Sequence, residues 1–277
     1  MKIYDEIGER NMDYKLKDLS GRTPDNIITL DIASVKTLQI GYHAENILLY
    51  YSENDEFTLK EYIGYTAYEY LGKVTANRFK TTIRYGRREE VNHDTYVEMF
   101  LPKSWHGELL LYTQYGYITC QETMDLERFA AETSEGTITL KEIRAPRIRL
   151  ASSSNYVTLE KGKGFVDVHT TSGSIDVISV EGGARLETTT GQITANFESL
   201  NNVVECNSLS GNMELTFADA CNISVDGITK TGQIQSDIEN VTIRMKPGNV
   251  KNVVGTKGEK PFQNVRLTSI NGNIILK

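Results

Sequence analysis

Histidines and carboxylates are the side chains of this sequence best suited to metal binding or acid–base catalysis. The histidines are His43, His93, His106 and His169, and no two of them have the spacing of a metal-binding pair such as H-x-x-x-H. The sequence also lacks a G-x-S-x-G elbow, a P-loop and a G-x-G-x-x-G motif. We therefore expect no metal site and no cofactor, and we interpret the histidines as solvated or packing residues.

Asp167, His169 and Glu187 form the strongest acid–base candidate. Polysaccharide lyases and glycosidases on parallel β-helices place carboxylates and a basic residue on one exposed face. If successive repeats stack, as argued below, His169 lies beside Glu187 in such a row. One pair of this kind is expected from composition alone, so we predict no catalytic residue and no enzymatic activity. A carbohydrate-active β-helix enzyme, either a polysaccharide lyase or a glycosidase, is the alternative.

Outward-facing tyrosines are the candidates for binding. Tyr115 and Tyr117 flank Gly116, and Tyr156 follows Asn155. Aromatic rings at a surface stack on sugars or mark a protein interface. These three tyrosines are therefore the possible binding surface, with a protein or a cell-envelope glycan as the partner. The alternative is that they pack against the N-terminal part of the chain.

Composition and charge exclude several kinds of partner. The 277 residues carry 30 Lys and Arg against 37 Asp and Glu, a net charge of -7, which disfavours attraction to nucleic acid or anionic lipid. No apolar run approaches the length of a membrane span, and the first residues lack the features of a secretory signal. We expect no nucleic-acid partner, no membrane span and no signal peptide in this chain, and the compartment stays open.

Two smaller groups of reactive or charged residues have plain interpretations. Cys120, Cys206 and Cys221 form no C-x-x-C pair, which predicts buried free thiols rather than disulfides or a zinc site. The segment from Arg84 to Glu90 mixes arginines with glutamates that neutralise them, and we interpret it as a solvated turn.

An internal repeat predicts the elements that hold these side chains. An anchor residue recurs at intervals of 20, 19, 18, 18, 20, 21 and 40 residues, the last reading as two periods: Gly116, Gly136, Asn155, Gly173, Gly191, Gly211, Gly232 and Gly272. A hydroxyl stands three residues before every anchor: Thr113, Thr133, Ser152, Thr170, Thr188, Ser208, Thr229 and Ser269. Apolar residues stand two and four residues after the anchors and five and seven before them, with few exceptions.

This alternation on both sides of a turn predicts two half-buried strands in each repeat. Because so short a repeat has no room for a crossover helix, successive coils are expected to stack and pair in parallel. We predict an all-β, single-stranded parallel β-solenoid, or β-helix, of 18–21-residue coils, with a β-sandwich as the weaker alternative. The glycines are expected to supply a positive φ at the turn, and Gly162-Lys163-Gly164 is expected to be a turn between coils.

The register of the repeat also assigns faces. Ile193, two residues after Gly191, is predicted to lie in the core. The hydroxyl row shares the parity of the apolar positions, so it is predicted to face inward and to be structural. Six residues before successive anchors, oppositely charged residues alternate and predict a ladder of surface salt bridges: Arg149, Asp167, Arg185 and Glu205.

Residues 1–108 lie outside the glycine register but contain strand-like runs, such as Ile27–Ile32, Thr37–Ile40 and Ile47–Tyr51. An open end of a strand stack promotes aggregation, and an irregular, aromatic-rich segment is suited to cover it. We predict that residues 1–108 form an irregular N-terminal β cap continuous with the solenoid repeats of residues 109–277. One short helix is expected within the first 25 residues.

The repeat resembles a known family. Thr170-Thr171-Ser172-Gly173-Ser174-Ile175 and the equivalent run from Ser269 to Ile274 are similar to the Thr-x-x-Gly-x-Ile pattern of the bacterial "putative adhesin" family, a β-strand-repeat domain of unknown function. The Leu101-Pro102 strand end and the strands from Ile27 to Tyr51 also resemble it, so the resemblance covers most of the chain. It implies a non-enzymatic interaction or structural module, associated with the bacterial cell envelope or its stress response.

Overall fold

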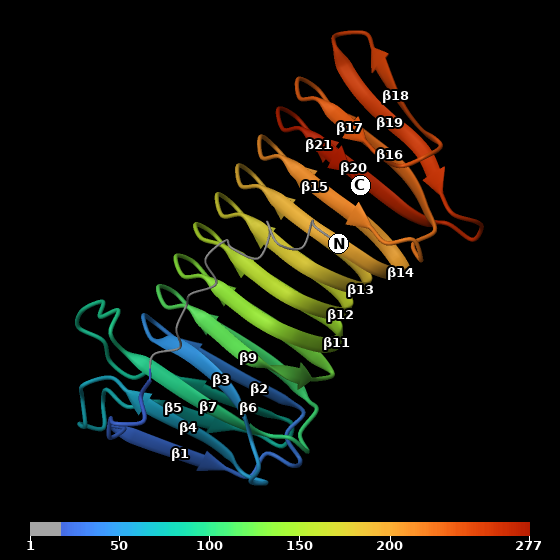
Figure 1. Cartoon of the computed structure of the whole chain (residues 1–277). Helices are drawn as coiled ribbons and strands as arrows, with labels where there is room; N and C mark the ends of the chain where they lie inside the picture. The colour runs from blue at the N-terminus through green and yellow to red at the C-terminus, as the bar shows by residue number, and fades with distance from the viewer. Residues whose placement is uncertain (1–17) are drawn as a thin grey trace.

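The structure is a computed structural model that describes residues 18–277 (Figure 1). It is all-β, with no helix among these residues. The short helix predicted within the first 25 residues falls largely outside the described range. The strands are, in chain order, β1 (Asn26–Leu30), β2 (Thr37–Tyr42), β3 (Asn46–Ser52), β4 (Phe57–Tyr62), β5 (Lys73–Ala76), β6 (Lys80–Arg84), β7 (Tyr96–Pro102), β8 (Glu108–Thr113), β9 (Ile118–Asp125), β10 (Arg128–Thr133), β11 (Ile138–Ser152), β12 (Val157–Thr170), β13 (Ile175–Thr188), β14 (Ile193–Ser208), β15 (Met213–Phe217), β16 (Ile223–Thr229), β17 (Ile234–Ser236), β18 (Val241–Lys246), β19 (Val250–Lys257), β20 (Gln263–Ser269) and β21 (Ile274–Leu276).

Long parallel strands form the middle of the molecule. β11, β12, β13 and β14 lie side by side in Figure 1, and each pairs in parallel with the next. Ile138 is paired with Val157, Val157 with Ile175, and Ile175 with Ile193. Equivalent residues of the repeat are therefore neighbours in space, and the predicted all-β class and parallel pairing are confirmed.

Inward-pointing apolar residues fill the interior of this stack. Ile193 is 0% exposed, which confirms its predicted place in the core. It belongs to one continuous cluster that runs from Ile32 near the N-terminus to Leu276 near the C-terminus. The cysteines lie in the same cluster as free thiols, and burial raises the pKa of Cys120 to about 12. A thiol with so high a pKa is unreactive at neutral pH and serves as a packing residue.

The hydroxyl row lies inside the turns, as predicted. The Thr133 Oγ1 accepts a hydrogen bond from the Gly136 amide at 3.0 Å and donates one to the Gly116 carbonyl at 3.0 Å. The same pair of contacts, to the residue's own anchor and to the anchor of the adjoining turn, recurs at Thr113, Ser152, Thr188 and Thr229. One buried hydroxyl thus satisfies two backbone groups and joins neighbouring turns.

The anchor glycines serve a different purpose from the one predicted. None of them has φ in the left-handed region, so the expected positive φ is wrong. A Cβ on Gly211 would lie 1.6 Å from the Gly191 carbonyl oxygen, and a Cβ on Gly136 would lie 1.7 Å from that of Gly116. Glycine is needed here because the stacked turns approach each other too closely to admit a side chain.

The order of the layers departs from the sequence order at the C-terminal end. β20 pairs in parallel with β14 on one side and with β16 on the other, so the last repeat lies between two earlier ones. Gly272 accordingly approaches Gly211, and Gly232 approaches Gly272. The expectation that the 40-residue interval spans two periods stacked in sequence order is wrong. The intervening residues instead form β18 and β19, an antiparallel pair that covers β16.

The N-terminal end has a matching arrangement. β2 and β3 pair in parallel with β8 and β9, and on their other side with β6 and β7. β4 then pairs antiparallel with β7, and β1 with β4. The first layer of the chain is therefore covered by later strands, just as the last layer is covered by earlier ones.

The segment Gly162-Lys163-Gly164 lies within β12, so the predicted turn between coils is wrong at this position. Its pairing with β13 is continuous, whereas the register with β11 shifts between Arg144 and Arg147. The strand remains continuous because Gly164, at φ 130°, accommodates the bend between the two faces of the stack, and a Cβ there would lie 1.9 Å from the Ala145 carbonyl oxygen.

Candidate binding surface

A groove hollows the outer face of the sheet towards its N-terminal end. It has a volume of about 450 Å³ and lies across β6, β2, β8, β10 and the second half of β11, which are neighbours in that order. The floor of the groove is low because Gly41 has no side chain and the outward-facing side chains of Ala130 and Ala151 are short. Longer side chains stand around this floor and form the walls. We call this surface the basic groove.

Three arginines line the basic groove, namely Arg84, Arg128 and Arg149. None of them makes an ion pair or a side-chain hydrogen bond with another residue of the described range 18–277. The Nε of Arg128 is buried and has no hydrogen-bond partner within that range. Glu132 is the one carboxylate in the described lining. Because a guanidinium presents a rigid set of donors that matches carboxylates and phosphates, the groove is suited to an anionic ligand.

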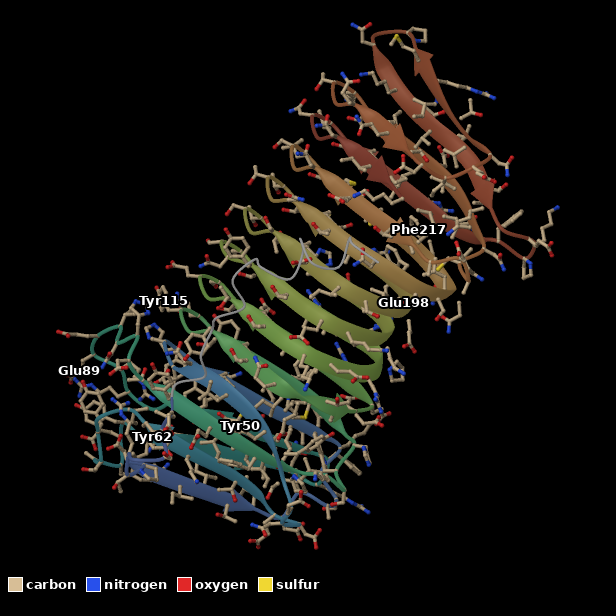
Figure 2. The ribbon with its side chains drawn as sticks, in the orientation of Figure 1. Tyr50, Tyr62, Glu89, Tyr115, Glu198 and Phe217 are labelled. Atoms are coloured by element: carbon tan, nitrogen blue, oxygen red, sulfur yellow. The ribbon has the colours of Figure 1, made fainter. Side chains whose placement is uncertain are left out.

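Aromatic side chains border the basic groove. Tyr85 and Tyr112 belong to its lining, and each is 37% exposed. The Tyr85 ring lies 5.6 Å from the His43 ring, and the His43 ring meets the Tyr115 ring edge-on at 5.1 Å between centroids. Figure 2 shows Tyr115 at the turn edge of the stack, close to the N-terminal strands. Tyr115, a predicted binding residue, thus adjoins the groove through His43.

The other two predicted tyrosines have different surroundings. Tyr117 is half-buried, and its ring meets Tyr96 edge-on at 6.4 Å between centroids. Burial and the neighbouring Tyr96 raise the pKa of Tyr117 well above its usual value. Tyr156 is 61% exposed, and its backbone is separated from Tyr117 by that of Thr137. The three tyrosines follow one turn edge, but their rings do not form a single cluster.

A second aromatic group covers the outer face of β3, β4 and β7. Leu48 is fully buried there beneath Tyr62 and Tyr96, and Leu19 completes the cluster. Tyr50, labelled with Tyr62 in Figure 2, stacks on Phe100 at 5.3 Å. Burial raises the pKa of Tyr50 to about 12. These rings form a small additional core that fastens the outer strands to the stack.

The acid–base candidate forms a closed set of contacts. His169 Nε2 lies 2.8 Å from Asp167 Oδ1, and its Nδ1 lies 3.0 Å from Glu187 Oε2. The hydrogen bond between His169 and Asp167 raises the pKa of His169 and lowers that of Asp167. Both ring nitrogens are therefore engaged by carboxylates, which favour the protonated form of the imidazole.

The row of alternating charge is present, with a different pattern of partners from the predicted one. Arg185 and Arg266 both reach Glu205, at 2.9 Å and 3.3 Å. Asp167 pairs with His169 instead of an arginine. Arg149 forms no ion pair with a described residue. Its neighbour in β12 is Asp167, which pairs with His169, and its neighbour in β10 is Ala130. The arginine at the end of the ladder is thereby left to face the basic groove.

Sequence reasoning missed most of this groove. Arg84 comes from the segment interpreted as a solvated turn, and Arg128 stands in a row that the repeat analysis did not follow. The available signal was the row of Arg149 itself, which continues through Ala130 and Leu110 without an acidic partner.

Arg88 corrects another expectation for the Arg84–Glu90 segment. Its Nε lies 2.5 Å from Glu45 Oε1, and both side chains are almost completely buried. Glu45 also accepts hydrogen bonds from the amides of His43 and Ala44. The segment is thus only partly solvated. Arg88 fastens it to the turn between β2 and β3, where it also lies over the Tyr85 ring at 5.6 Å.

Residues 18–277 contain no cluster of three or more His, Cys, Asp or Glu side chains arranged to hold a metal ion. Within the same residues, no helix has the length and apolar character needed to cross a membrane.

Comparisons with known proteins identify a family model and a similar solved structure. A family model described as Toastrack DUF4097 matches residues 72–277. The crystal structure of a putative adhesin from Bacteroides fragilis is similar, with a TM-score of 0.57, 12% sequence identity, and coverage of 91% of this chain and 97% of that one. A putative adhesin from Parabacteroides distasonis has a TM-score of 0.48 and 12% identity, with coverage of 91% and 96%. None of the curated proteins compared with the chain matches it.

Proposed function

Because the chain belongs to the Toastrack DUF4097 family, whose domain has no assigned function, we propose that it is a non-enzymatic binding module built on a β-solenoid of 18–21-residue coils. Residues 1–108 are its N-terminal β cap, and residues 109–277 are the solenoid repeats. The parallel pairing of β2 with β8 and of β3 with β9 supports the continuity of the two regions. The finding that carries the proposal is the basic groove, whose arginines lack partners within the described residues.

The partner is a protein or a glycan of the bacterial cell envelope. The resemblance to proteins named putative adhesins supports this location. The tyrosines at positions 115, 117 and 156 extend the surface from the groove along the turn edge, and Tyr156 is the most exposed of them. Stacking on aromatic rings and hydrogen bonding to guanidinium groups are both means of recognising sugars and acidic side chains.

Retention on isolated bacterial envelopes tests the proposal. We expect the chain to bind, and Ala130→Trp, which fills the floor of the groove, to lower retention at least about tenfold. Thr216→Trp, at a half-buried outward position of β15, is the matched control. Protease-treated and periodate-treated envelopes distinguish a protein partner from a glycan. Equal retention of the two variants would show that the groove is not the binding surface.

The arrangement around His169 supports the interpretation of the chain as a non-enzymatic module. A general acid or base needs a proton-accepting or proton-donating atom open to the substrate, whereas both ring nitrogens are already bound to Asp167 and Glu187. Acidic and neutral polysaccharides incubated with the chain are expected to show no new reducing ends and no unsaturated products. Turnover that disappears in Glu187→Gln would establish the carbohydrate-active alternative.

A further inference from the structure

The basic groove has a charge opposite to that of the whole chain. The protein carries a net charge of -7, yet Arg84, Arg128 and Arg149 stand against the single carboxylate of Glu132 in the described lining. Elsewhere on the same face, arginines are paired with acids, as Arg185 and Arg266 are with Glu205. A local excess of positive charge in a concave surface attracts anions and strengthens their hydrogen bonds.

We infer that the basic groove binds the carboxylate groups of an acidic polysaccharide of the uronic-acid type, an inference that rests on the proposed function. The guanidinium groups would each donate paired hydrogen bonds to one carboxylate.

The spacing of the arginines favours a polymer over a single small anion. Arg128 and Arg149 come from adjacent strands, β10 and β11, whereas Arg84 comes from β6, with β2 and β8 between it and β10. At a strand separation of about 4.8 Å, Arg84 and Arg149 are separated by about 19 Å along the stack. A chain that carries a carboxylate on each of several successive units can meet all three arginines at once.

The strands beneath the groove favour a sugar chain over a peptide. β2, β8 and β10 are each paired on both sides, so an extended peptide finds no free edge to which it could add as a strand. Recognition must come from side chains instead. Tyr85 and Tyr112 offer partly exposed ring faces beside the arginines, a combination suited to the apolar faces and charged groups of sugar rings.

Titration calorimetry with a matched pair of probes tests the inference. Tetragalacturonate carries the carboxylates, and its methyl ester has the same sugar chain with the charges removed. We expect the acid to bind the full chain with an affinity that falls as salt is added, and the ester to bind at least about tenfold more weakly. Poly-glutamate and inorganic phosphate of matched charge serve as further probes.

Variants locate the site. Arg84→Gln combined with Arg149→Gln is expected to weaken tetragalacturonate binding at least about tenfold. Both side chains are exposed, so the fold is expected to persist, and circular dichroism checks it. Arg266→Gln removes an arginine of the same row that lies far along the stack, and it should leave the affinity within about twofold.

Each outcome decides something. Equal binding of the ester would overturn the role of the carboxylates while leaving envelope binding, and so the proposed function, in place. Tighter binding of poly-glutamate or phosphate would replace the sugar by another anion. Acid binding that is unaffected by the double variant would place the site elsewhere. Absence of tetragalacturonate binding, together with envelope retention that Ala130→Trp abolishes, would overturn the ligand class alone.

Discussion

Most repeats place one buried hydroxyl where it bonds to the amide of its own anchor and to the carbonyl of the adjoining anchor. Thr188 is 7% exposed, accepts a hydrogen bond from the Gly191 amide at 3.0 Å and donates one to the Gly173 carbonyl at 3.3 Å. The period-two pattern was sufficient to predict that this row faces inward. The identity of its partners was not contained in the pattern, because the acceptor belongs to the adjoining turn.

Replacing Thr188 with Val preserves the shape of the side chain and leaves a buried amide and carbonyl without the hydroxyl. We expect a loss of about 1 to 3 kcal/mol in the free energy of unfolding. Thr190→Val, at an exposed position of the same turn, should change it by no more than about 0.5 kcal/mol. Urea denaturation measures both. Equal stabilities would mean that the hydroxyl row does not support the turns.

The bonds of His169 predict a pH dependence of stability. Its pKa is raised from 6.5 by Asp167, so its contribution is complete below that value and is lost as the pH rises through the folded-state pKa. The pKa of Asp167 is lowered from 3.8, so the contribution of Asp167 to stability is present above pH 3.8 and is lost as the pH falls through its folded-state pKa. His169→Gln should therefore lower the free energy of unfolding most between about pH 4 and pH 6.5, and less at about pH 9.

Thermal melts of wild type and His169→Gln across this pH range provide the measurement. The difference should stay below about 1 kcal/mol, because the side chains are partly exposed and salt screens them. A constant difference at all pH values would argue that the imidazole acts through packing rather than charge.

At the scale of elements, the close approach of stacked turns sets the strongest requirement on residue type. The glycine spacing predicted the positions of the turns correctly, but it did not indicate why glycine is required at them. A single repeat provides no steric contact that excludes a side chain, and the exclusion arises only when a second turn lies against the first. Glu45 occupies the anchor position of the β2–β3 turn, where Gly116 lies next to it.

Gly211→Ala tests this requirement. The added Cβ would meet the Gly191 carbonyl oxygen at 1.6 Å, so the two turns must separate and their hydrogen bonds must stretch. We expect a loss of at least about 2 kcal/mol. Gly21→Ala is the control, since nothing lies within 4 Å of its added Cβ. Similar melting temperatures for the two variants would contradict the stacking of these turns.

At the scale of the whole molecule, the first and the last parallel layers of the described chain, which contain β2 and β20, are placed one layer inside the stack. β20 lies between β14 and β16, and β2 lies between β6 and β8. Chain termini usually fray, but here outer strands such as β18 and β19 cover the terminal layers. The free edges belong to these covers, and β18 is largely exposed.

Hydrogen exchange distinguishes this order of layers from a strictly sequential one. We expect the amides of β20 to be protected as strongly as those of β13, although β20 is close to the C-terminus, while the amides of β18 exchange much faster. Mass spectrometry of peptic fragments resolves the three strands. Faster exchange in β20 than in β18 would contradict the inserted last layer.

The sequence by itself determined the all-β class, the parallel register and the inward rows, since side-chain alternation with a period of two is a local property that each repeat carries independently. Ile193 and the hydroxyl row could be placed on this basis alone. The tertiary structure alone decided the order of layers at the two ends, because Tyr42 and Glu45 replace the hydroxyl and the glycine in the first layer and remove the signal. It also decided the basic groove. Arg84, Arg128 and Arg149 are distant in the chain, and only the insertion of β2 between β6 and β8 brings them to one surface, where none of them forms an ion pair with a described residue.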